Sequence, residues 1–320
     1  RDDAHAVGAG DAQVRKDTDI TDADITNTYD LLGRTTYTVD ANNHFVTTSY
    51  DALGRTVSEA SNWATTRYQH DLAGRRTRLT WNDGFYISYD YDLTGNVTAI
   101  RENGAASGIG VLGTYAYDDL GRRTSLTRGN GTVTSYSFDP ASRLTALTQN
   151  LAGTTQDLTI NGFTYNPASQ IKVLTRSNDA YAWSGYVNVN RPYTANGLNQ
   201  LTSAGAVSLG YDGRGNLTNS DGTNYAYNSK NQLRTGPNVQ YLYYDPLGRL
   251  DQIIAPGWTS WTSLDYDGQD LIAEYANNTN TILRRYVHGP GDDEPLVWYE
   301  GSGTTDRRWL HADERGSVIA

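Results

Sequence analysis

Aspartate is the residue whose type and spacing in this sequence first suggest chemistry. It recurs in equivalent positions about every 20 residues. Convergent carboxylates would give a polysaccharide-degrading enzyme its acid and its base. A residue that recurs once in each unit is better explained by turns, because an Asp side chain accepts hydrogen bonds from backbone N–H groups two residues further on. We therefore expect a structural role for the recurring carboxylates, which are Asp30, Asp51, Asp71, Asp92, Asp118, Asp139, Asp212 and Asp245.

Arginine recurs beside these carboxylates and has two possible roles. A guanidinium binds acidic saccharides well, but it also pairs with a nearby carboxylate or stacks on a tyrosine ring. We favour the structural role and leave saccharide binding open. The recurring residues are Arg34, Arg55, Arg75, Arg122, Arg143 and Arg249.

Metal and cofactor chemistry has little support in the sequence. There are five His and no Cys, and no HExxH spacing. The acidic group Asp17, Asp19, Asp22 and Asp24 lacks the Gly and Glu of a calcium-binding EF-hand. The glycine-rich stretch 104–113 lacks the Lys of a phosphate-binding loop. We expect no metal site, no cofactor and no catalytic residue.

Composition excludes two classes of partner. The 320 residues carry a formal charge of -10 without a basic cluster, so we expect no nucleic-acid binding. No apolar run is long enough for a membrane helix, so we expect no membrane insertion.

The chain has 24 Tyr but 4 Phe, and because a tyrosine hydroxyl needs a partner or water, this favours a thin wall over a thick core. The start at Arg1 and the absence of Met suggest a fragment.

Each recurring Asp stands second in a six-residue frame, Tyr-Asp-x-x-Gly-Arg or Asn. Degenerate copies begin at His70, Phe138, Tyr165, Tyr193 and Tyr227. The residues of the six clearest copies are Tyr29, Asp30, Gly33 and Arg34; Tyr50, Asp51, Gly54 and Arg55; Tyr91, Asp92 and Gly95; Tyr117, Asp118, Gly121 and Arg122; Tyr211, Asp212 and Gly215; and Tyr244, Asp245, Gly248 and Arg249. We expect the Asp245 copy to be an ordinary repeat turn like the others.

The frame predicts the tip of a β-hairpin. Asp is favoured at the first position of a type I turn, and Gly three residues later takes the positive φ that closes a short hairpin with a bulge. Alternating aromatics before each tip place the rings on one face of a strand. The predicted fold class is all-β, a hairpin array that forms a spiral or solenoid-like curved sheet. We expect one domain, 1–320, with a polar lead-in over 1–25, repeats over 29–270 and a different segment over 285–320.

These hexamers resemble the YD repeats of bacterial RHS and wall-associated proteins and of teneurins. The segment 285–320 is similar to the approach to the RHS-associated core, with Arg285 to Gly291 and Leu310 to Asp313 as the matching residues. The resemblance implies an arc of a hollow RHS shell that encloses a C-terminal toxin. The DPxGL-like signature of the family's autoproteolytic core is absent up to Ala320, so that core and the toxin are expected to lie outside this chain.

The function that the resemblance implies is a structural shell segment for a toxin or other cargo of the same polypeptide, and not an enzyme. Such a protein would be secreted or on the bacterial cell surface, in some cases delivered by a secretion apparatus. One alternative is an extracellular carbohydrate- or cell-surface-binding module, for which clustered, exposed Trp258 and Trp261 would be the signal. A second alternative is a polysaccharide-degrading enzyme with perturbed acids among the repeats.

Overall fold

The computed structural model describes residues 13–17, 25–151, 153–276 and 281–320. Within the predicted polar lead-in, Gln13–Asp17 form strand β1, which pairs antiparallel with the next strand. The other acidic residues of the lead-in, Asp19, Asp22 and Asp24, lie outside the described residues. Of the acidic group Asp17, Asp19, Asp22 and Asp24, only Asp17 is therefore among the described residues.

Contacts divide the chain into two compact units. Unit 1 comprises residues 1–66 and 187–282, and unit 2 comprises residues 67–186 and 283–320. Each unit thus combines an earlier and a later part of the sequence. That all 320 residues make one domain stays a prediction.

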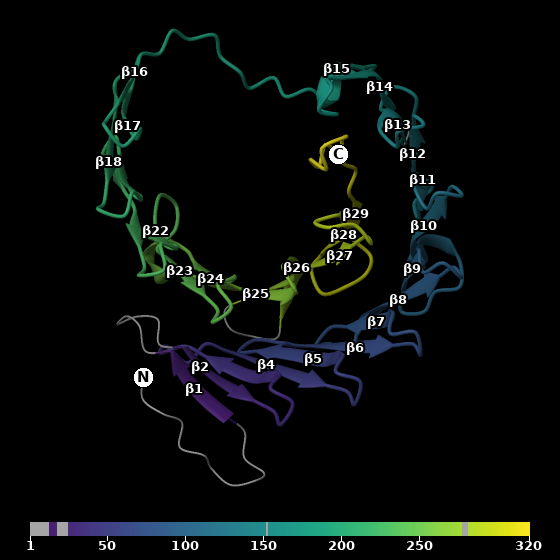
Figure 1. The fold of residues 1–320 in the computed structure, drawn as a ribbon, viewed down its shortest axis with the longest axis horizontal. Helices are drawn as coiled ribbons and strands as arrows, with labels where there is room; N and C mark the ends of the chain where they lie inside the picture. The colour runs from purple at the N-terminus through teal and green to yellow at the C-terminus, as the bar shows by residue number, and fades with distance from the viewer. Residues whose placement is uncertain (1–12, 18–24, 152, 277–280) are drawn as a thin grey trace. The chain divides into compact units, whose positions relative to one another are not determined.

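Unit 1 consists of short antiparallel strands in chain order (Figure 1). After β1 its earlier part contains β2 (Ile25–Tyr29), β3 (Thr35–Val39), β4 (Phe45–Tyr50), β5 (Thr56–Ser61) and the start of β6 (Thr65–His70). Its later part contains β16 (Tyr193–Ala195), β17 (Leu201–Ala204), β18 (Val207–Tyr211), β19 (Leu217–Ser220), β20 (Thr223–Asn224), β21 (Ala226–Tyr227), β22 (Leu233–Thr235), β23 (Tyr241–Tyr244), β24 (Leu250–Ile254), the 3-10 turn η3 (Pro256–Trp258), β25 (Trp261–Asp267) and β26 (Asp270–Ala276).

Unit 2 is built in the same way from longer strands. Its earlier part contains the end of β6, β7 (Arg76–Thr80), β8 (Tyr86–Tyr91), β9 (Val97–Glu102), η1 (Gly108–Gly110), β10 (Val111–Tyr117), β11 (Arg123–Arg128), β12 (Val133–Phe138), β13 (Leu144–Asn150), β14 (Leu158–Tyr165), β15 (Ile171–Arg176) and η2 (Asp179–Tyr181). Its later part contains β27 (Ile282–His288), β28 (Pro295–Glu300) and β29 (Arg307–Trp309).

The predicted all-β class is confirmed. Among the described residues there is no α-helix, and the helical content is three 3-10 turns of three residues each. The sheets formed by these residues do not close into a barrel. No helix in the described part of the chain has the length and apolar character needed to cross a bilayer.

The hexamers form hairpin tips because glycine supplies the backbone conformation that the turn needs. The prediction of positive φ is confirmed for all six glycines, with values of 78° at Gly33, 84° at Gly54, 96° at Gly95, 73° at Gly121, 90° at Gly215 and 89° at Gly248. The strand pairing shifts register beside the tyrosine that precedes the turn, as between Asp90 and Tyr91. This is the bulge expected where one extra residue enters a hairpin.

Each unit has a core between its earlier and its later strands. In unit 1, Val46 from β4, Ile254 from β24 and Leu264 from β25 are buried. In unit 2, Leu79 and Ile100 from the earlier strands and Val297 from β28 are buried. The opposite ends of the hairpins carry leucines such as Leu72 and Leu93 in full contact with solvent. Apolar side chains are therefore buried between the two layers of each unit, whereas the leucines of the hairpin tips lie in solvent.

The first prediction concerns Gly95, whose φ is 96° and around which a Cβ would meet nothing within 4 Å. We expect Gly95→Val to lower the free energy of unfolding by about 1 kcal/mol or more, because a β-branched residue is strained at this φ while no clash contributes. Denaturant unfolding followed by circular dichroism measures the change. Gly213→Ala is the matched control, since Gly213 lies in a repeat turn without positive φ and also has open space. Equal costs in the two variants would contradict the argument.

Candidate functional site

The repeated Asp closes its own turn with both carboxylate oxygens. In the first repeat, Asp30 Oδ1 accepts hydrogen bonds from the N–H groups of Leu32 and Arg34, each at 2.9 Å. Its Oδ2 accepts from Arg34 Nε at 2.7 Å. The backbone closes the same loop, because Gly33 N–H donates to the Asp30 carbonyl at 3.0 Å. The carboxylate is thus held by the turn that it stabilises.

The repeated Arg links one turn to the next. Arg34 Nη1 donates to the carbonyl of Asp51, the Asp of the following repeat, at 3.3 Å. The guanidinium lies 4.5 Å from the centre of the Tyr50 ring, and the Tyr50 hydroxyl donates back to the Thr35 carbonyl at 2.9 Å. The same arrangement recurs in unit 2, where Arg75 donates to the Asp92 carbonyl at 3.0 Å. Both structural roles that the sequence suggested for Arg, pairing and stacking, occur together.

Repeats that lack the Asp and Arg pair contain a matched replacement. Where Asn takes the place of Asp, Gln takes the place of Arg, and the two amides bond to each other at 2.7 to 2.8 Å. Where Asp is kept but Arg becomes Asn, the amide donates to the carboxylate at 2.9 to 3.0 Å. The Asn and Gln pairs are Asn166 with Gln170, Asn196 with Gln200 and Asn228 with Gln232, and the Asp and Asn pairs are Asp92 with Asn96 and Asp212 with Asn216.

The environment of the turn carboxylates keeps them ionised and makes them weak bases. The hydrogen bond from the Arg34 backbone, together with the guanidinium of the same residue, lowers the pKa of Asp30. Asp118 also has a lowered pKa, chiefly because of the Arg122 side chain. A general base works best with a pKa near the working pH, and these shifts go the other way.

One turn of this type was not singled out from the sequence. Asp40 Oδ1 accepts from the backbone N–H groups of Asn42 and His44, and Asp40 Oδ2 lies 3.1 Å from His44 Nδ1. Asn43 has a φ of 64° at the position of the glycine. The signal was present in the sequence as Asp-x-x-Asn-His, with Asn in place of Gly and His in place of Arg. The hydrogen bond to Asp40 raises the pKa of His44.

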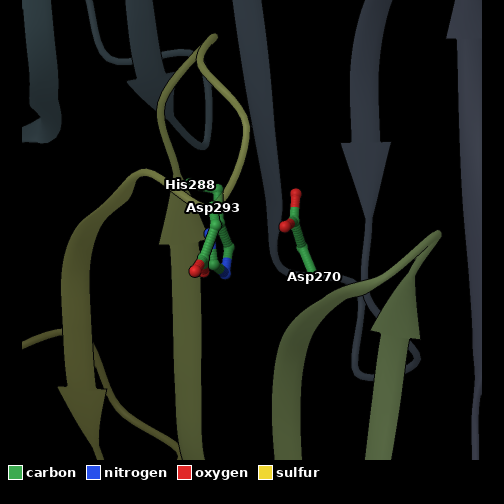
Figure 2. A group of neighbouring side chains, drawn as sticks. All are labelled: Asp270, His288 and Asp293. Carbon is green, nitrogen blue, oxygen red and sulfur yellow. The ribbon is translucent and has the colours of Figure 1, made fainter. Parts of the chain in front are cut away.

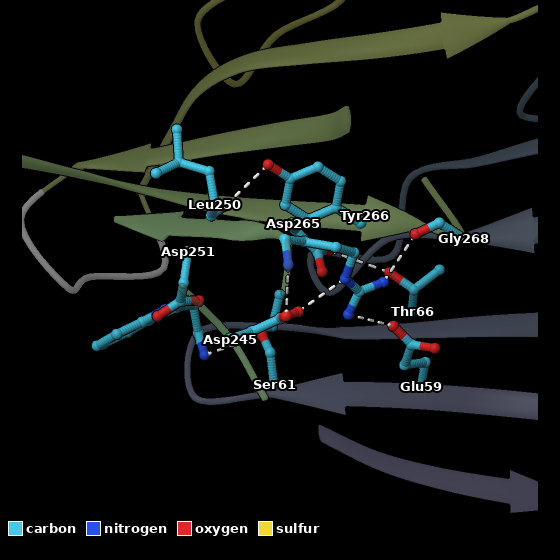
Figure 3. A network of polar contacts seen from close by, with 12 residues as sticks. Glu59, Ser61, Thr66, Asp245, Leu250, Asp251, Asp265, Tyr266 and Gly268 are labelled. Atoms are coloured by element: carbon cyan, nitrogen blue, oxygen red, sulfur yellow. Dashed lines mark hydrogen bonds and ion pairs between the residues drawn. The ribbon is translucent and has the colours of Figure 1, made fainter. Parts of the chain in front are cut away.

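The Asp245 turn differs from the other clear copies because it is buried. Its internal bonds are ordinary, with Arg249 Nε donating to Asp245 Oδ2 at 2.7 Å, but Asp245 and Arg249 are only 7% and 8% exposed. Arg249 also pairs with Glu59 at 2.9 Å and donates to the Gly268 carbonyl at 2.9 Å (Figure 3). The turn thus has the geometry of an ordinary repeat turn, and its burial is what distinguishes it. The reason is that β5 of the same unit packs over it.

Two further carboxyl groups of unit 1 are buried beside this turn (Figure 3). Asp251 Oδ1 accepts from Trp63 Nε1 at 2.8 Å, and its Oδ2 has no hydrogen-bond partner among the described residues. Asp265 Oδ2 accepts from Thr66 Oγ1 at 3.1 Å. Burial raises the pKa of Asp251 to about 6 and that of Asp265 to about 7. These perturbed acids were not identified from the sequence, because neither belongs to the hexamer.

An aromatic groove of unit 1 includes both tryptophans that the sequence suggested as a binding signal. Trp258 is 56% exposed and has a φ of 59°, an unusual backbone conformation for a bulky residue. Its ring lies 27° from parallel with Tyr241, with 6.4 Å between the ring centres. The groove is lined by Asn42, His44, Tyr243, Gln252, Ile254, Trp258 and Trp261.

A smaller polar pair lies at the end of β27 in unit 2. Figure 2 shows His288 and Asp293 beside each other, and their possible ligand atoms lie within 4.8 Å. The third residue drawn there, Asp270, belongs to unit 1. Two ligands from one hairpin do not complete a zinc site, which takes three or four protein side chains. The absence of a metal site stays a prediction.

The chain is similar to known proteins in sequence and in structure. The model of the RHS repeat family matches residues 117–155. The tRNA3(Ser)-specific nuclease WapA of Bacillus spizizenii is 27% identical over 175 residues, which are 52% of this chain and 7% of that protein. The Photorhabdus luminescens Tc holotoxin pore aligns with 93% of this chain and 23% of its own chain, at 14% identity and a TM-score of 0.44. The TcdB2-TccC3 structure without its hypervariable C-terminal region gives the same coverage, at 16% identity and a TM-score of 0.46.

The second prediction follows from the buried acids of unit 1. Because the pKa of Asp265 is about 7 in the folded state and about 3.9 in an unfolded chain, the folded state binds more protons between these values. The free energy of unfolding therefore falls as the pH rises from about 4 through about 7. Asp265→Asn, which stays neutral, should flatten this dependence and raise the free energy of unfolding at about pH 8 by roughly 1 kcal/mol or more.

Thermal unfolding of both proteins across this pH range measures the effect. Asp30→Asn is the control, because the pKa of the half-buried Asp30 is lowered and its neutralisation should give no gain at high pH. An Asp265→Asn protein that is less stable than the parent at high pH would show that the ionised carboxylate is favourably bound, against the argument.

Proposed function

Because the chain belongs to the RHS-repeat, or YD-repeat, proteins, we propose that it is a wall segment that encloses a cargo, in the first instance a toxin domain of the same polypeptide. The observation that carries this proposal is the link between successive turns. Arg34, Arg75 and Arg122 each bind their own Asp and the backbone of the next repeat, so the neighbouring hairpins are fastened edge to edge. A sheet whose neighbouring hairpins are fastened in this way suits a barrier, because it leaves few exposed strand edges.

The chemistry of the chain supports a role without catalysis. The recurring carboxylates have both oxygens occupied within their turns, as Asp118 shows with bonds from Leu120 and Arg122. The acids with raised pKa, Asp251 and Asp265, are only 4% and 7% exposed and are bonded to Trp63 and Thr66. A polysaccharide would have to displace these contacts to reach them. A polysaccharide-degrading enzyme is therefore the less favoured alternative.

The location and the partners belong to the same proposal. A toxin-enclosing wall acts outside the cell that makes it, so we place the protein among secreted or cell-surface bacterial proteins, with a secretion apparatus as a possible partner. The chain spans about 7% of the length of its curated relative. The activity printed for that relative, a tRNA-specific nuclease, is a property of the relative.

The third prediction tests the wall by changing a turn in the complete polypeptide that carries this chain. We expect Asp118→Leu to destabilise locally by roughly 0.5 to 2 kcal/mol, by analogy with lost helix caps. We expect Asp118→Asn to cost less, because Asn keeps the acceptor for the backbone N–H groups of Leu120 and Arg122, and an exposed ion pair contributes at most about 1 kcal/mol. The double variant Asp118→Asn with Arg122→Gln recreates the pair found at Asn166 and Gln170, and is the matched control.

Limited proteolysis, with the intact cargo fragment as readout, measures the consequence. Cargo protection should be lost at a lower temperature in the Leu variant than in the parent, and should be kept in the Asn variants. Polysaccharide turnover is assayed in parallel. Loss of turnover in Asp118→Asn at an unchanged melting temperature would identify a catalytic carboxylate and refute the proposal.

A second candidate function is carbohydrate binding in the aromatic groove, and Trp258 is the observation that favours it. Its ring is exposed although burial would be favourable, and its left-handed backbone is a costly conformation of the kind that collects at functional sites. Flat aromatic faces beside amide side chains such as Gln252 suit the stacking and hydrogen bonding of a sugar ring.

The fourth prediction is that a neutral oligosaccharide binds this groove and that Trp258→Ala weakens its binding about tenfold or more, as expected for a central aromatic contact. A glycan array followed by titration of the strongest binder measures this. Trp183→Ala is the control, because Trp183 is also exposed, at 75%, but does not line the groove. No binding on the array, or equal weakening by both substitutions, would remove this candidate.

A further inference from the structure

Arg128, the last residue of β11 in unit 2, is a buried cation that has no carboxylate partner among the described residues. The residue is 6% exposed. The one side-chain hydrogen bond that it makes to the described residues joins Nη1 to Thr134 Oγ1 at 2.8 Å, and its Nε has none. By contrast, the buried Arg249 is held by two carboxylates. A buried charge without compensation is costly, so such groups are normally paired or bind a ligand.

No carboxylate among the described residues forms an ion pair with Arg128. His311 is 4% exposed, and burial together with the positive charge of Arg128 lowers its pKa to about 3, which keeps the ring neutral. The nearby carboxylates have other partners. Glu294 is bound by Arg123 Nη2 at 2.9 Å, and Asp313 lies 3.4 Å from Arg176 Nη2. Desolvation lowers the pKa of Arg128 itself, as expected for a cation that lacks a counter-charge.

A cavity of about 210 Å³ lies against this cation. Its volume equals that of about seven water molecules, which is enough for a small polar group. Leu126, Leu296 and Leu310 supply apolar walls. Arg128, Tyr136 and Gln149 supply polar groups. Four carboxylates also line the cavity, those of Asp292, Asp293, Glu294 and Asp313, and the last two are paired with Arg123 and Arg176. A cavity with apolar walls and a few converging polar side chains is a common composition of a ligand site.

We propose that this cavity of unit 2 binds a carboxylate group that pairs with the guanidinium of Arg128. The planar fork of a guanidinium matches a carboxylate and can donate two parallel hydrogen bonds to it. A dianion such as phosphate fits less well, because one cation faces the cavity while exposed Asp292 and Asp293 also line it. The carboxylate can come from a free small acid or from an acidic side chain of a peptide. The site does not depend on whether the chain encloses a cargo.

The test is a titration of the intact chain at constant ionic strength with three probes: acetate, N-acetyl-aspartate amide and inorganic phosphate. We expect saturable binding of at least one of the two carboxylates at one site, measured by calorimetry, with an increase in melting temperature. Arg128→Met should weaken that binding about tenfold or more, the effect of removing one charged hydrogen-bonding partner. Tighter binding of acetate assigns the site to a free acid, and tighter binding of the aspartate derivative assigns it to a peptide side chain.

Two control variants separate binding from folding. Arg143→Met removes an arginine that already pairs with Asp139 at 2.7 Å, and it should leave the affinity unchanged. Arg128→Lys keeps the charge without the fork and should give an intermediate affinity. In the absence of ligand, Arg128→Met should melt no lower than the parent, because it removes an uncompensated charge. The proposal is overturned by any of three results: no saturable carboxylate binding, equal binding by Arg128→Met, or tighter binding of phosphate than of both carboxylates.

Discussion

The carboxylate of the repeated turn is the interaction on which the array depends. One oxygen of Asp30 holds two backbone N–H groups and the other holds the arginine that ends the turn. Each bond contributes modestly, since a net hydrogen bond is worth about 0.5 to 1.5 kcal/mol. Their effect is geometric as well, because the turn fixes where both strands begin and hence which residues face the core. The aromatic residues that alternate along each strand are thereby placed on one face of the sheet.

The arginine extends this local order to the neighbouring repeat. Because Arg75 binds Asp71 and also the carbonyl of Asp92, two successive turns share one side chain. A protein whose units contact mainly their neighbours gains stability from such interfaces in proportion to their number. The Asn and Gln pairs keep the hydrogen bond within the turn, but a Gln side chain is shorter than the Arg side chain that contacts the next repeat elsewhere. Gln232 still donates to the Gly248 carbonyl at 3.1 Å, so the link survives without a charge.

The local part of this structure could be read from the sequence, and the long-range part could not. The hexamer specifies a turn, a positive φ and a strand on either side, all within a few residues, and these expectations were met. The Asp40 turn follows the same rule but was missed, because Asn43 and His44 replace the usual Gly and Arg. The burial of Asp245 depends on Glu59 and its strand, far away in sequence, and the hexamer is identical in form whether buried or exposed.

The similarity of the hexamers means that they cannot by themselves determine which strands pack against each other. Strands repeated about every 20 residues with similar apolar faces could pack in several registers, each displaced by one repeat. Contacts made by residues outside the hexamer remove this degeneracy. In unit 1 the indole of Trp63 meets the carboxyl of Asp251, which no neighbouring repeat offers at the same position. In unit 2 Arg307 and the Tyr299 hydroxyl both bind Glu102, at 2.7 and 2.6 Å.

Buried polar contacts of this kind add little net stability, but a wrong register leaves each partner unpaired in the core, at a cost of about 1 to 3 kcal/mol per group and more for a charge. The residues outside the hexamer therefore determine the packing register, while the hexamers and their flanking strands form the sheet.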